Sequence, residues 1–117
     1  MRLFIYGTLK TNKSRNFYLS DKHYANAHFV KASRTAPKYR LVKSWLLDYP
    51  CLLDDSRGIA VEGELWDVPE EKIPLIDAIE GHPNLFQRRL IELEDGEEAQ
   101  AYFIREVPWF SWHIQAF

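Results

Sequence analysis

The sequence predicts an α+β domain dominated by a curved sheet or a small barrel, and three observations lead to this fold class. Short runs rich in β-branched and aromatic residues recur along the chain, each bounded by glycine, proline or a polar turn. One segment, residues 67–81, instead combines helix start and stop signals with apolar residues at helical spacing. The 117 residues, 46% hydrophobic and 27% charged, suit one globular core. We therefore expect a single domain over residues 1–117.

The first half of the chain is expected to contribute three strands. Residues 2–6 form a short apolar run that stops at a glycine, which is typical of a buried strand. Residues 28–35 and 38–43 are two further β-rich runs around a proline, and they could form a hairpin. Residues 12–20 are polar with aromatic residues near their end, a pattern consistent with a short helix or a loop.

Further strands are expected on either side of the helical segment. From residue 59 to residue 68, polar and apolar side chains alternate with the period of two that strands require, directly after a polar turn at residues 54–58. Residues 88–94 and 99–106 form another pair of β-rich runs, joined by a short acidic loop. This pair predicts a hairpin.

Residues 67–81 carry the clearest helix pattern. Asp67 can cap the helix, Pro69 suits its first turn, and Gly81 suits the exit at its C-terminus. Isoleucines recur at spacings of three, which places them near one another on a helix. Because Pro74 lies early in the segment, we expect a delayed or irregular first turn.

The charge and cysteine content exclude several classes of partner. Fifteen Lys and Arg residues against 17 Asp and Glu residues give a formal net charge of −2, so we expect no binding to nucleic acid or to an anionic membrane. Cys51 is the single cysteine of the sequence, which excludes an intramolecular disulfide and fits a reducing compartment. The N-terminal apolar run is too short for a signal peptide or a membrane span, so we expect a cytoplasmic location.

The usual signatures of metal, phosphate and nucleophilic chemistry are missing from the sequence. It has no phosphate-binding glycine motif, no paired cysteines and no serine nucleophile elbow, and its four histidines include no i,i+4 pair. We therefore expect no metal and no cofactor. Cys51 could be a nucleophile, but its apolar neighbours favour packing. His82 could be a base, but its place between a glycine and a proline favours a turn.

Two segments carry candidate functional residues at the ends of predicted elements. In Tyr6-Gly7-Thr8-Leu9, the glycine permits unusual backbone angles, and consecutive N–H groups could converge on a carboxylate. An ordinary strand-ending turn is the alternative. The second candidate is Glu80, because the helix dipole and partial burial would both raise its pKa toward the range useful for proton transfer. A solvated glutamate is the alternative.

In this order along the chain, the two segments resemble the γ-glutamylcyclotransferase-like family, also called AIG2-like. The resemblance covers nearly the whole chain and is closest to the γ-glutamylamine cyclotransferase branch. The motifs that carry it are Tyr6-Gly7-Thr8-Leu9, Tyr49-Pro50, the Val-Glu-Gly-Glu-Leu-Trp run at residues 61–66, residues 77–88, and Tyr102.

The resemblance implies a small mixed β-barrel flanked by short helices, and an enzyme that releases 5-oxoproline. In this reaction the α-amine of the substrate attacks its own γ-carbonyl, and Glu80 acts as the general acid/base. Backbone amides of residues 6–9 hold the α-carboxylate, and Tyr102 is a further candidate pocket residue, with a hydroxyl bonded to the backbone as the alternative. The partner is then a small γ-glutamyl amide or amine, and we expect a monomer or a weak homodimer. Family members often have tyrosine where this chain has Phe86, so a hydroxyl that could orient the substrate is absent.

Two other functions stay open from the sequence. The first is a non-catalytic ligand-binding or protein-interaction module on the same fold. Its docking patch would be the C-terminal aromatic residues, for which we expect packing across the barrel mouth instead. The second is a thiol-dependent amidase or acyltransferase centred on Cys51. The C-terminal aromatic residues of the docking patch are Trp109, Phe110, Trp112 and Phe117.

Overall fold

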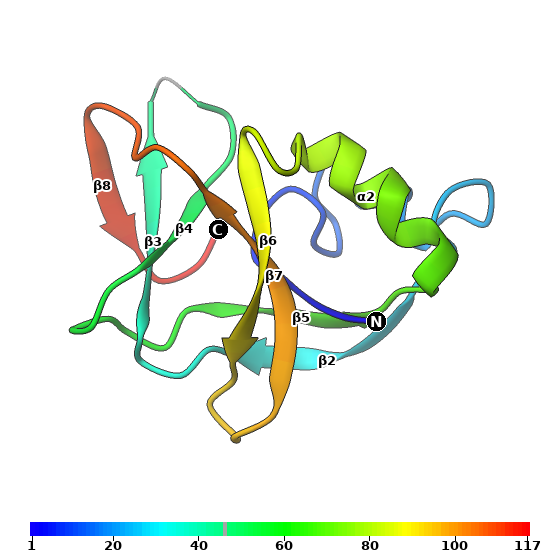
Figure 1. Cartoon of the computed structure of the whole chain (residues 1–117), viewed down its shortest axis with the longest axis horizontal. Coiled ribbons are helices and arrows are strands. Elements are labelled where there is room, and N and C mark those ends of the chain that lie inside the picture. Colours follow the sequence, from blue (N-terminus) through cyan, green and yellow to red (C-terminus); the bar gives the residue numbers. More distant parts are fainter. Residues whose placement is uncertain (46) are drawn as a thin grey trace.

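The computed structural model describes residues 1–45 and 47–117 of the chain. Its main feature is an eight-stranded mixed sheet that curls into a half-barrel, with a few short helices beside it (Figure 1). This arrangement confirms the predicted fold class. The strands are β1 (Arg2–Ile5), β2 (His28–Arg34), β3 (Tyr39–Ser44), β4 (Cys51–Asp54), β5 (Glu62–Asp67), β6 (Phe86–Glu92), β7 (Glu98–Ile104) and β8 (Ser111–Ile114). The helical elements are α1 (Phe17–Ser20), the 3₁₀ turn η1 (Glu70–Lys72) and α2 (Ile73–Glu80).

The sheet contains both parallel and antiparallel pairs. Its strand order is β2-β5-β1-β7-β4-β3-β8, and β6 pairs with β7 off this path. β7 runs parallel to both β1 and β4, whereas the other pairs are antiparallel. β1 therefore lies in the interior of the sheet, and the turn that follows it is positioned by strands on both sides.

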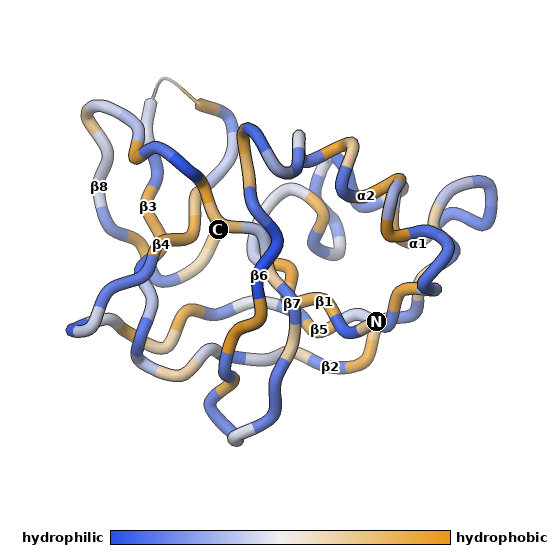
Figure 2. The backbone as a smooth tube through the Cα atoms, in the orientation of Figure 1, coloured by the Kyte–Doolittle hydropathy of each residue, from blue (hydrophilic) through white to orange (hydrophobic). Residues whose placement is uncertain are grey.

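Side chains of β1 alternate between two apolar clusters, as the geometry of a strand requires. Leu3 and Ile5 belong to a cluster that includes buried residues of both α-helices, whereas Phe4 belongs to a second cluster formed by strands and loops. Hydrophobic and hydrophilic residues alternate along α2 (Figure 2), and its buried Ile73 and Ile76 pack into the first cluster. This packing fixes the C-terminal end of α2 close to the end of β1.

The start of α2 differs from the prediction, whereas its end agrees. Asp67 is the last residue of β5 rather than a helix cap, and its carboxylate lies 3.8 Å from the N-terminal ammonium group. The 3₁₀ turn comes first, because Pro69 is extended and Pro74 occupies the first turn of the α-helix. Gly81 ends the helix with a φ of 67°, the left-handed conformation that glycine adopts readily.

The predicted hairpin between the second and third strands is wrong. β2 pairs with β5, and β3 pairs with β4 and β8. The connection is held by contacts with other segments, since the buried Thr35 hydroxyl accepts the Val61 N–H at 3.0 Å and the Ala36 N–H donates to the Glu92 carbonyl. The predicted hairpin of β6 and β7 is confirmed, with Glu92 opposite Glu98 at its end.

Part of the C-terminal aromatic segment forms a strand, β8, that the sequence pattern did not predict. β8 pairs with β3 at one edge of the sheet. The expected packing of this segment across the barrel mouth is wrong, because the exposed fractions are 77% for Trp109, 67% for Phe110 and 47% for Trp112. Phe117 is partly buried, with the Lys13 ammonium 4.9 Å from its ring centre.

Candidate active site

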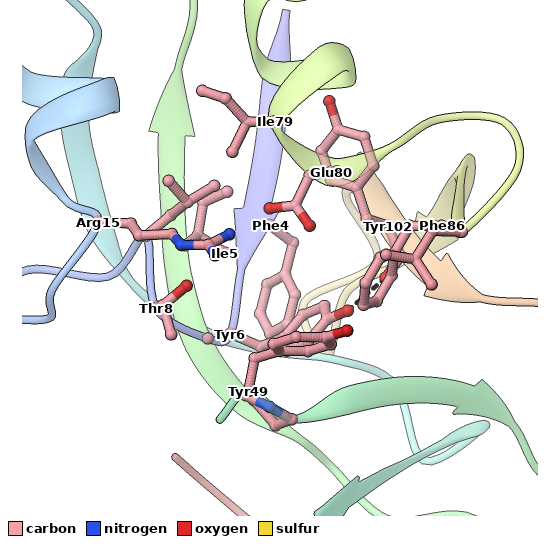
Figure 3. Close-up of a pocket in the computed structure, with 14 residues that line it drawn as sticks. Phe4, Ile5, Tyr6, Thr8, Arg15, Tyr49, Ile79, Glu80, Phe86 and Tyr102 are labelled. Carbon is pink, nitrogen blue, oxygen red and sulfur yellow. Dashed lines mark hydrogen bonds between the residues drawn. The ribbon is translucent and has the colours of Figure 1, made fainter. Parts of the chain in front are cut away.

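A cavity of about 230 Å³ lies where the end of β1, the end of α2 and the strands β6 and β7 meet (Figure 3). Its lining combines aromatic and aliphatic side chains with a few polar groups, as small-molecule sites commonly do. The structure thereby brings together all six predicted site residues, from the turn at residues 6–9, Glu80 and Tyr102. The full lining is residues 4–9, Arg15, Tyr49, Pro50, Ile79, Glu80, Leu85, Phe86 and Tyr102.

Glu80 is the last residue of α2, and its carboxylate points into the cavity (Figure 3). The side chain is half-buried, and its carboxylate accepts no hydrogen bond from residues 1–45 or 47–117. Burial raises the pKa of Glu80 to about 7, and the positive charge of Arg15 opposes part of this rise. A carboxyl group with such a pKa can accept and donate a proton near neutral pH.

The turn at residues 6–9 leaves backbone N–H groups unused, while the carbonyl groups of its last three residues accept hydrogen bonds. The Thr8 carbonyl accepts the Arg15 N–H at 2.9 Å, and the Leu9 carbonyl accepts the Asn16 side-chain amide at 2.8 Å. The N–H groups of the last three turn residues donate to no acceptor in the described part of the chain. Consecutive unused N–H groups are suited to binding an anion.

Close packing fixes this turn against the loop that precedes β4. A Cβ atom added to Gly7 would lie 3.3 Å from two ring carbons of Pro50, so a larger residue would press on the proline ring. Tyr49 from the same loop places its ring 5.7 Å from the ring of Phe86. Phe86 is buried and lines the cavity, so this position forms an apolar wall.

The two predicted tyrosines line the cavity, and each hydroxyl already donates a hydrogen bond. The Tyr6 hydroxyl donates to the Tyr102 carbonyl, and the Tyr102 hydroxyl donates to the Asp77 carboxylate at 2.7 Å. Tyr102 thus bonds a side chain rather than the backbone. The Asp77 carboxylate also accepts two bonds from the Arg88 guanidinium, at 2.9 and 3.3 Å. Burial raises the pKa of both tyrosines, so both hydroxyls stay protonated at neutral pH.

Burial opposes ionisation of Asp77, but the hydrogen bonds from Arg88 and Tyr102 outweigh it. The pKa of Asp77 consequently lies below its ordinary value. The three side chains come from α2, β6 and β7. They connect the helix that carries Glu80 to two neighbouring strands of the sheet.

Cys51 and His82 lie outside the cavity lining. Cys51 is buried, which confirms the expected packing, and burial raises the pKa of its thiol to about 11. The thiol is therefore protonated at neutral pH and poorly suited to nucleophilic attack. The Nδ1 atom of His82 accepts the Arg88 N–H at 3.0 Å in the turn after α2, which supports the turn interpretation.

No sequence pattern pointed to Arg15 as a site residue, yet Arg15 lines the cavity. Arg15 lies in a polar segment before α1 that also contains Lys10 and Lys13. Nothing in the local pattern distinguishes it from those two cations, because its position depends on how the segment folds back onto the turn. Asp77 and Arg88 are the first and last residues of one of the family-like motifs, but no sequence pattern indicated that they pair.

The described residues offer neither a metal-binding cluster nor a membrane-spanning helix. Within the part of the chain that the structure describes, no group of three or more His, Cys, Asp or Glu side chains is arranged to hold a metal ion. None of its helices has the length and apolar character needed to cross a bilayer.

Fold and cavity together define a protein built on a curled mixed sheet, with a carboxyl group of raised pKa in a small cavity. The model of a protein family described as "Gamma-glutamyl cyclotransferase, AIG2-like" matches residues 3–113. The chain belongs to this family of enzymes.

Individual relatives agree with the family match. Gamma-glutamylaminecyclotransferase A of Danio rerio is 32% identical over 109 residues, which cover 87% of this chain and 68% of that protein. The gamma-glutamylaminecyclotransferase of Homo sapiens is 33% identical over 98 residues, which cover 79% of this chain and 61% of that protein. The crystal structure of an AIG2-like protein from Mus musculus superimposes with a TM-score of 0.84 at 25% identity, covering 99% of this chain and 86% of that one.

Proposed function

We propose that the chain is a cyclotransferase that converts a γ-glutamyl amine or γ-glutamyl amino acid into 5-oxoproline and a free amine. The observation that carries the proposal is the Glu80 carboxyl group, which points into a small cavity shared with unused backbone N–H groups and has a pKa of about 7. The activity named for two relatives supports the same reaction.

Binding begins at the turn of residues 6–9. Its unused N–H groups hold the α-carboxylate of the substrate, and this contact places the neighbouring α-amine beside Glu80. The rings of Tyr49 and Phe86 enclose the carbon chain, so that it folds back and brings the γ-carbonyl within reach of the amine. Well-oriented intramolecular reactions reach effective molarities on the order of 10⁵–10⁸ M, so the reaction needs no protein nucleophile.

Glu80 moves a proton between the two nitrogen atoms of the substrate. As a carboxylate it takes a proton from the attacking α-amine while the new C–N bond forms at the γ-carbon. As a carboxylic acid it gives a proton to the departing nitrogen while the old C–N bond breaks. The lactam 5-oxoproline and the free amine leave, and Glu80 is ionised again. A pKa of about 7 suits both steps near neutral pH.

We propose that residues 1–117 act as one domain, in the cytoplasm, as a monomer or a weak homodimer. The protonated, buried thiol of Cys51 is compatible with a reducing compartment. Cell fractionation and sedimentation velocity would test location and oligomeric state separately from activity.

A second candidate function is a non-catalytic protein-interaction module on the same fold. The observation that favours it is the exposure of Trp109, Phe110 and Trp112 along one edge of the sheet. This function predicts a bound protein partner and no turnover of any γ-glutamyl compound.

The test is 5-oxoproline release, measured by mass spectrometry from a panel of γ-glutamyl amines and dipeptides. We expect release by the wild type, and a kcat about 10²- to 10⁴-fold lower for Glu80→Gln, because the amide cannot exchange the proton. Glu71→Gln is the matched control, since Glu71 is exposed on η1, and it should retain full activity. A fully active Glu80→Gln variant would contradict the role of Glu80. No release from any panel member would favour the interaction module.

A further inference from the structure

Arg15 is the charged residue of the cavity for which the proposed reaction gives no role. The residue is exposed, yet its guanidinium turns toward the cavity (Figure 3). The side chain makes no hydrogen bond and no ion pair within residues 1–45 and 47–117, although its charge acts on the Glu80 carboxyl group. A guanidinium group offers five N–H donors in a fixed planar arrangement. All of them remain available to a ligand.

The backbone holds Arg15 next to the turn that carries the unused N–H groups. Its own N–H donates to the Thr8 carbonyl at 2.9 Å, and the side-chain amide of the next residue, Asn16, donates to the Leu9 carbonyl at 2.8 Å. These two bonds fasten residues 15 and 16 to the turn. Figure 3 shows the Arg15 guanidinium between Thr8 and the Glu80 carboxylate.

A γ-glutamyl substrate places an anion at this location. Its α-carbon carries both the amine that must lie beside Glu80 and the carboxylate, so the two groups lie on adjacent bonds. A carboxylate held at the turn therefore lies on the same side of the cavity as the Arg15 guanidinium. Backbone N–H groups supply partial charges, whereas a guanidinium supplies a full charge and two parallel hydrogen bonds to a carboxylate.

We propose that Arg15 binds the α-carboxylate of the γ-glutamyl group together with the backbone N–H groups of the turn, and so selects substrates in which this carboxylate is free. The inference rests on the proposed cyclotransferase function. It goes beyond that function by assigning a side chain to the carboxylate and by excluding γ-glutamyl compounds whose α-carboxylate is blocked.

The competing role for Arg15 is recognition of a carboxylate on the leaving amino acid. Two substrates separate these roles: γ-glutamylalanine, whose leaving group has a carboxylate, and γ-glutamylethylamine, whose leaving group has none. If Arg15 binds the α-carboxylate, Arg15→Gln lowers kcat/KM for both substrates by a similar factor, about 10- to 100-fold for the loss of a charge-assisted pair. A loss confined to γ-glutamylalanine would overturn the proposal in favour of the leaving group.

A third substrate completes the test, the analogue of γ-glutamylethylamine in which a neutral carboxamide replaces the α-carboxylate. For the wild type, this change should lower kcat/KM by at least the factor caused by Arg15→Gln. For the Arg15→Gln variant, the same change in the substrate should lower kcat/KM by a clearly smaller factor, because the positive charge that pairs with the α-carboxylate is already gone. An equal factor of loss in kcat/KM for the wild type and for Arg15→Gln would overturn the proposal, since it would show that Arg15 and the α-carboxylate act independently.

Two controls keep the outcomes distinct. Arg57→Gln removes the same charge from an exposed turn away from the cavity and should leave all rates unchanged. Arg15→Lys keeps the charge but not the planar donor pair, and should restore part of the loss. If the wild type turns over both unblocked substrates and Arg15→Gln turns them over equally well, this inference alone is overturned. A wild type without turnover removes the proposed function and this inference together.

Discussion

The carboxyl group of Glu80 lowers the stability of the folded chain at neutral pH, because burial raises its pKa from 4.5 to about 7. Between these pH values the folded chain keeps a proton that the unfolded chain has released. Stability therefore falls as the pH rises through this window, by about 3 kcal/mol in total. Glu80→Gln removes the charged form, so we expect this variant to be more stable than the wild type at about pH 8. The difference should shrink at about pH 4. Urea unfolding at the two pH values measures it.

The neighbours of Glu80 leave the sign of this prediction unchanged. Arg15 opposes the rise in the pKa of Glu80, while the facing Tyr6, Tyr49 and Tyr102 have raised pKa values and stay protonated across the window. Glu71→Gln, on the exposed surface, should give no such pH-dependent difference. Equal stability of the wild type and Glu80→Gln at the higher pH would show that water reaches the carboxylate freely.

Some residues of the candidate site can be predicted from the sequence, and others cannot. Glu80 can be placed from sequence because it ends a helix beside a glycine, and the turn at residues 6–9 because a buried strand stops there. The position of Arg15 cannot be predicted in this way, since the polar segment before α1 contains several cations and shows no periodicity. Its place depends on two hydrogen bonds to the turn, which exist only after the segment has folded back.

At the scale of elements, three side chains connect the helix that carries Glu80 to the sheet. Asp77 of α2 accepts hydrogen bonds from Arg88 of β6 and from Tyr102 of β7. Tyr102→Phe removes one of these bonds and keeps the ring that lines the cavity. We expect it to lower the free energy of unfolding by about 1.5–3 kcal/mol, the usual contribution of a hydrogen bond to a charged group, with little change in kcat. Urea unfolding and 5-oxoproline release measure the two effects.

Tyr24→Phe is the matched control for Tyr102→Phe. Tyr24 is exposed, and Tyr24→Phe should alter the free energy of unfolding by no more than about 0.5 kcal/mol. If Tyr102→Phe lost turnover while keeping its stability, the hydroxyl would belong to the chemistry rather than to the support of the helix.

Elements with strong local signals were predicted well, whereas the pairing of strands that are not joined by a short turn was not. The hairpin of β6 and β7 follows from two β-rich runs around an acidic turn. β2 and β3 have the same kind of signal, but the sheet separates them. Thr35 bonds to Val61, the residue before β5, and Ala36 bonds to Glu92 of β6. The parallel pairing of β7 with β1 and β4 joins residues far apart in sequence, for which periodicity holds no information.

The cavity is a property of the whole molecule. The bond from the Tyr6 hydroxyl to the Tyr102 carbonyl joins residues 96 positions apart, and the lining comes from segments near both ends and the middle of the chain. A cavity assembled in this way exists only when the sheet is complete. Folding of the whole chain is therefore needed to bring the unused N–H groups and the Glu80 carboxylate together.

The exposed aromatic edge also depends on the whole fold, because it results from the position of β8 at the end of the sheet. Trp109 and Phe110 are highly exposed, and Phe110 has a φ of 54°, which asparagine tolerates better than phenylalanine. We expect Trp109→Ser combined with Phe110→Asn to change stability by no more than about 0.5 kcal/mol per site and to leave turnover unchanged. The bond from Ser44 to the Trp109 carbonyl involves only the backbone at position 109 and should persist.

The measurable consequence of this double substitution is weaker self-association. Exposed apolar patches favour contacts between molecules, so sedimentation velocity at high protein concentration should show less dimer for the double variant than for the wild type. A large loss of stability would instead mean that these rings pack against the barrel in solution. A loss of turnover without unfolding would show that the aromatic edge is coupled to the cavity. The Trp45 and Phe110 ring centres lie 6.2 Å apart, and the β3–β4 connection that contains Trp45 also contains Tyr49 of the cavity lining.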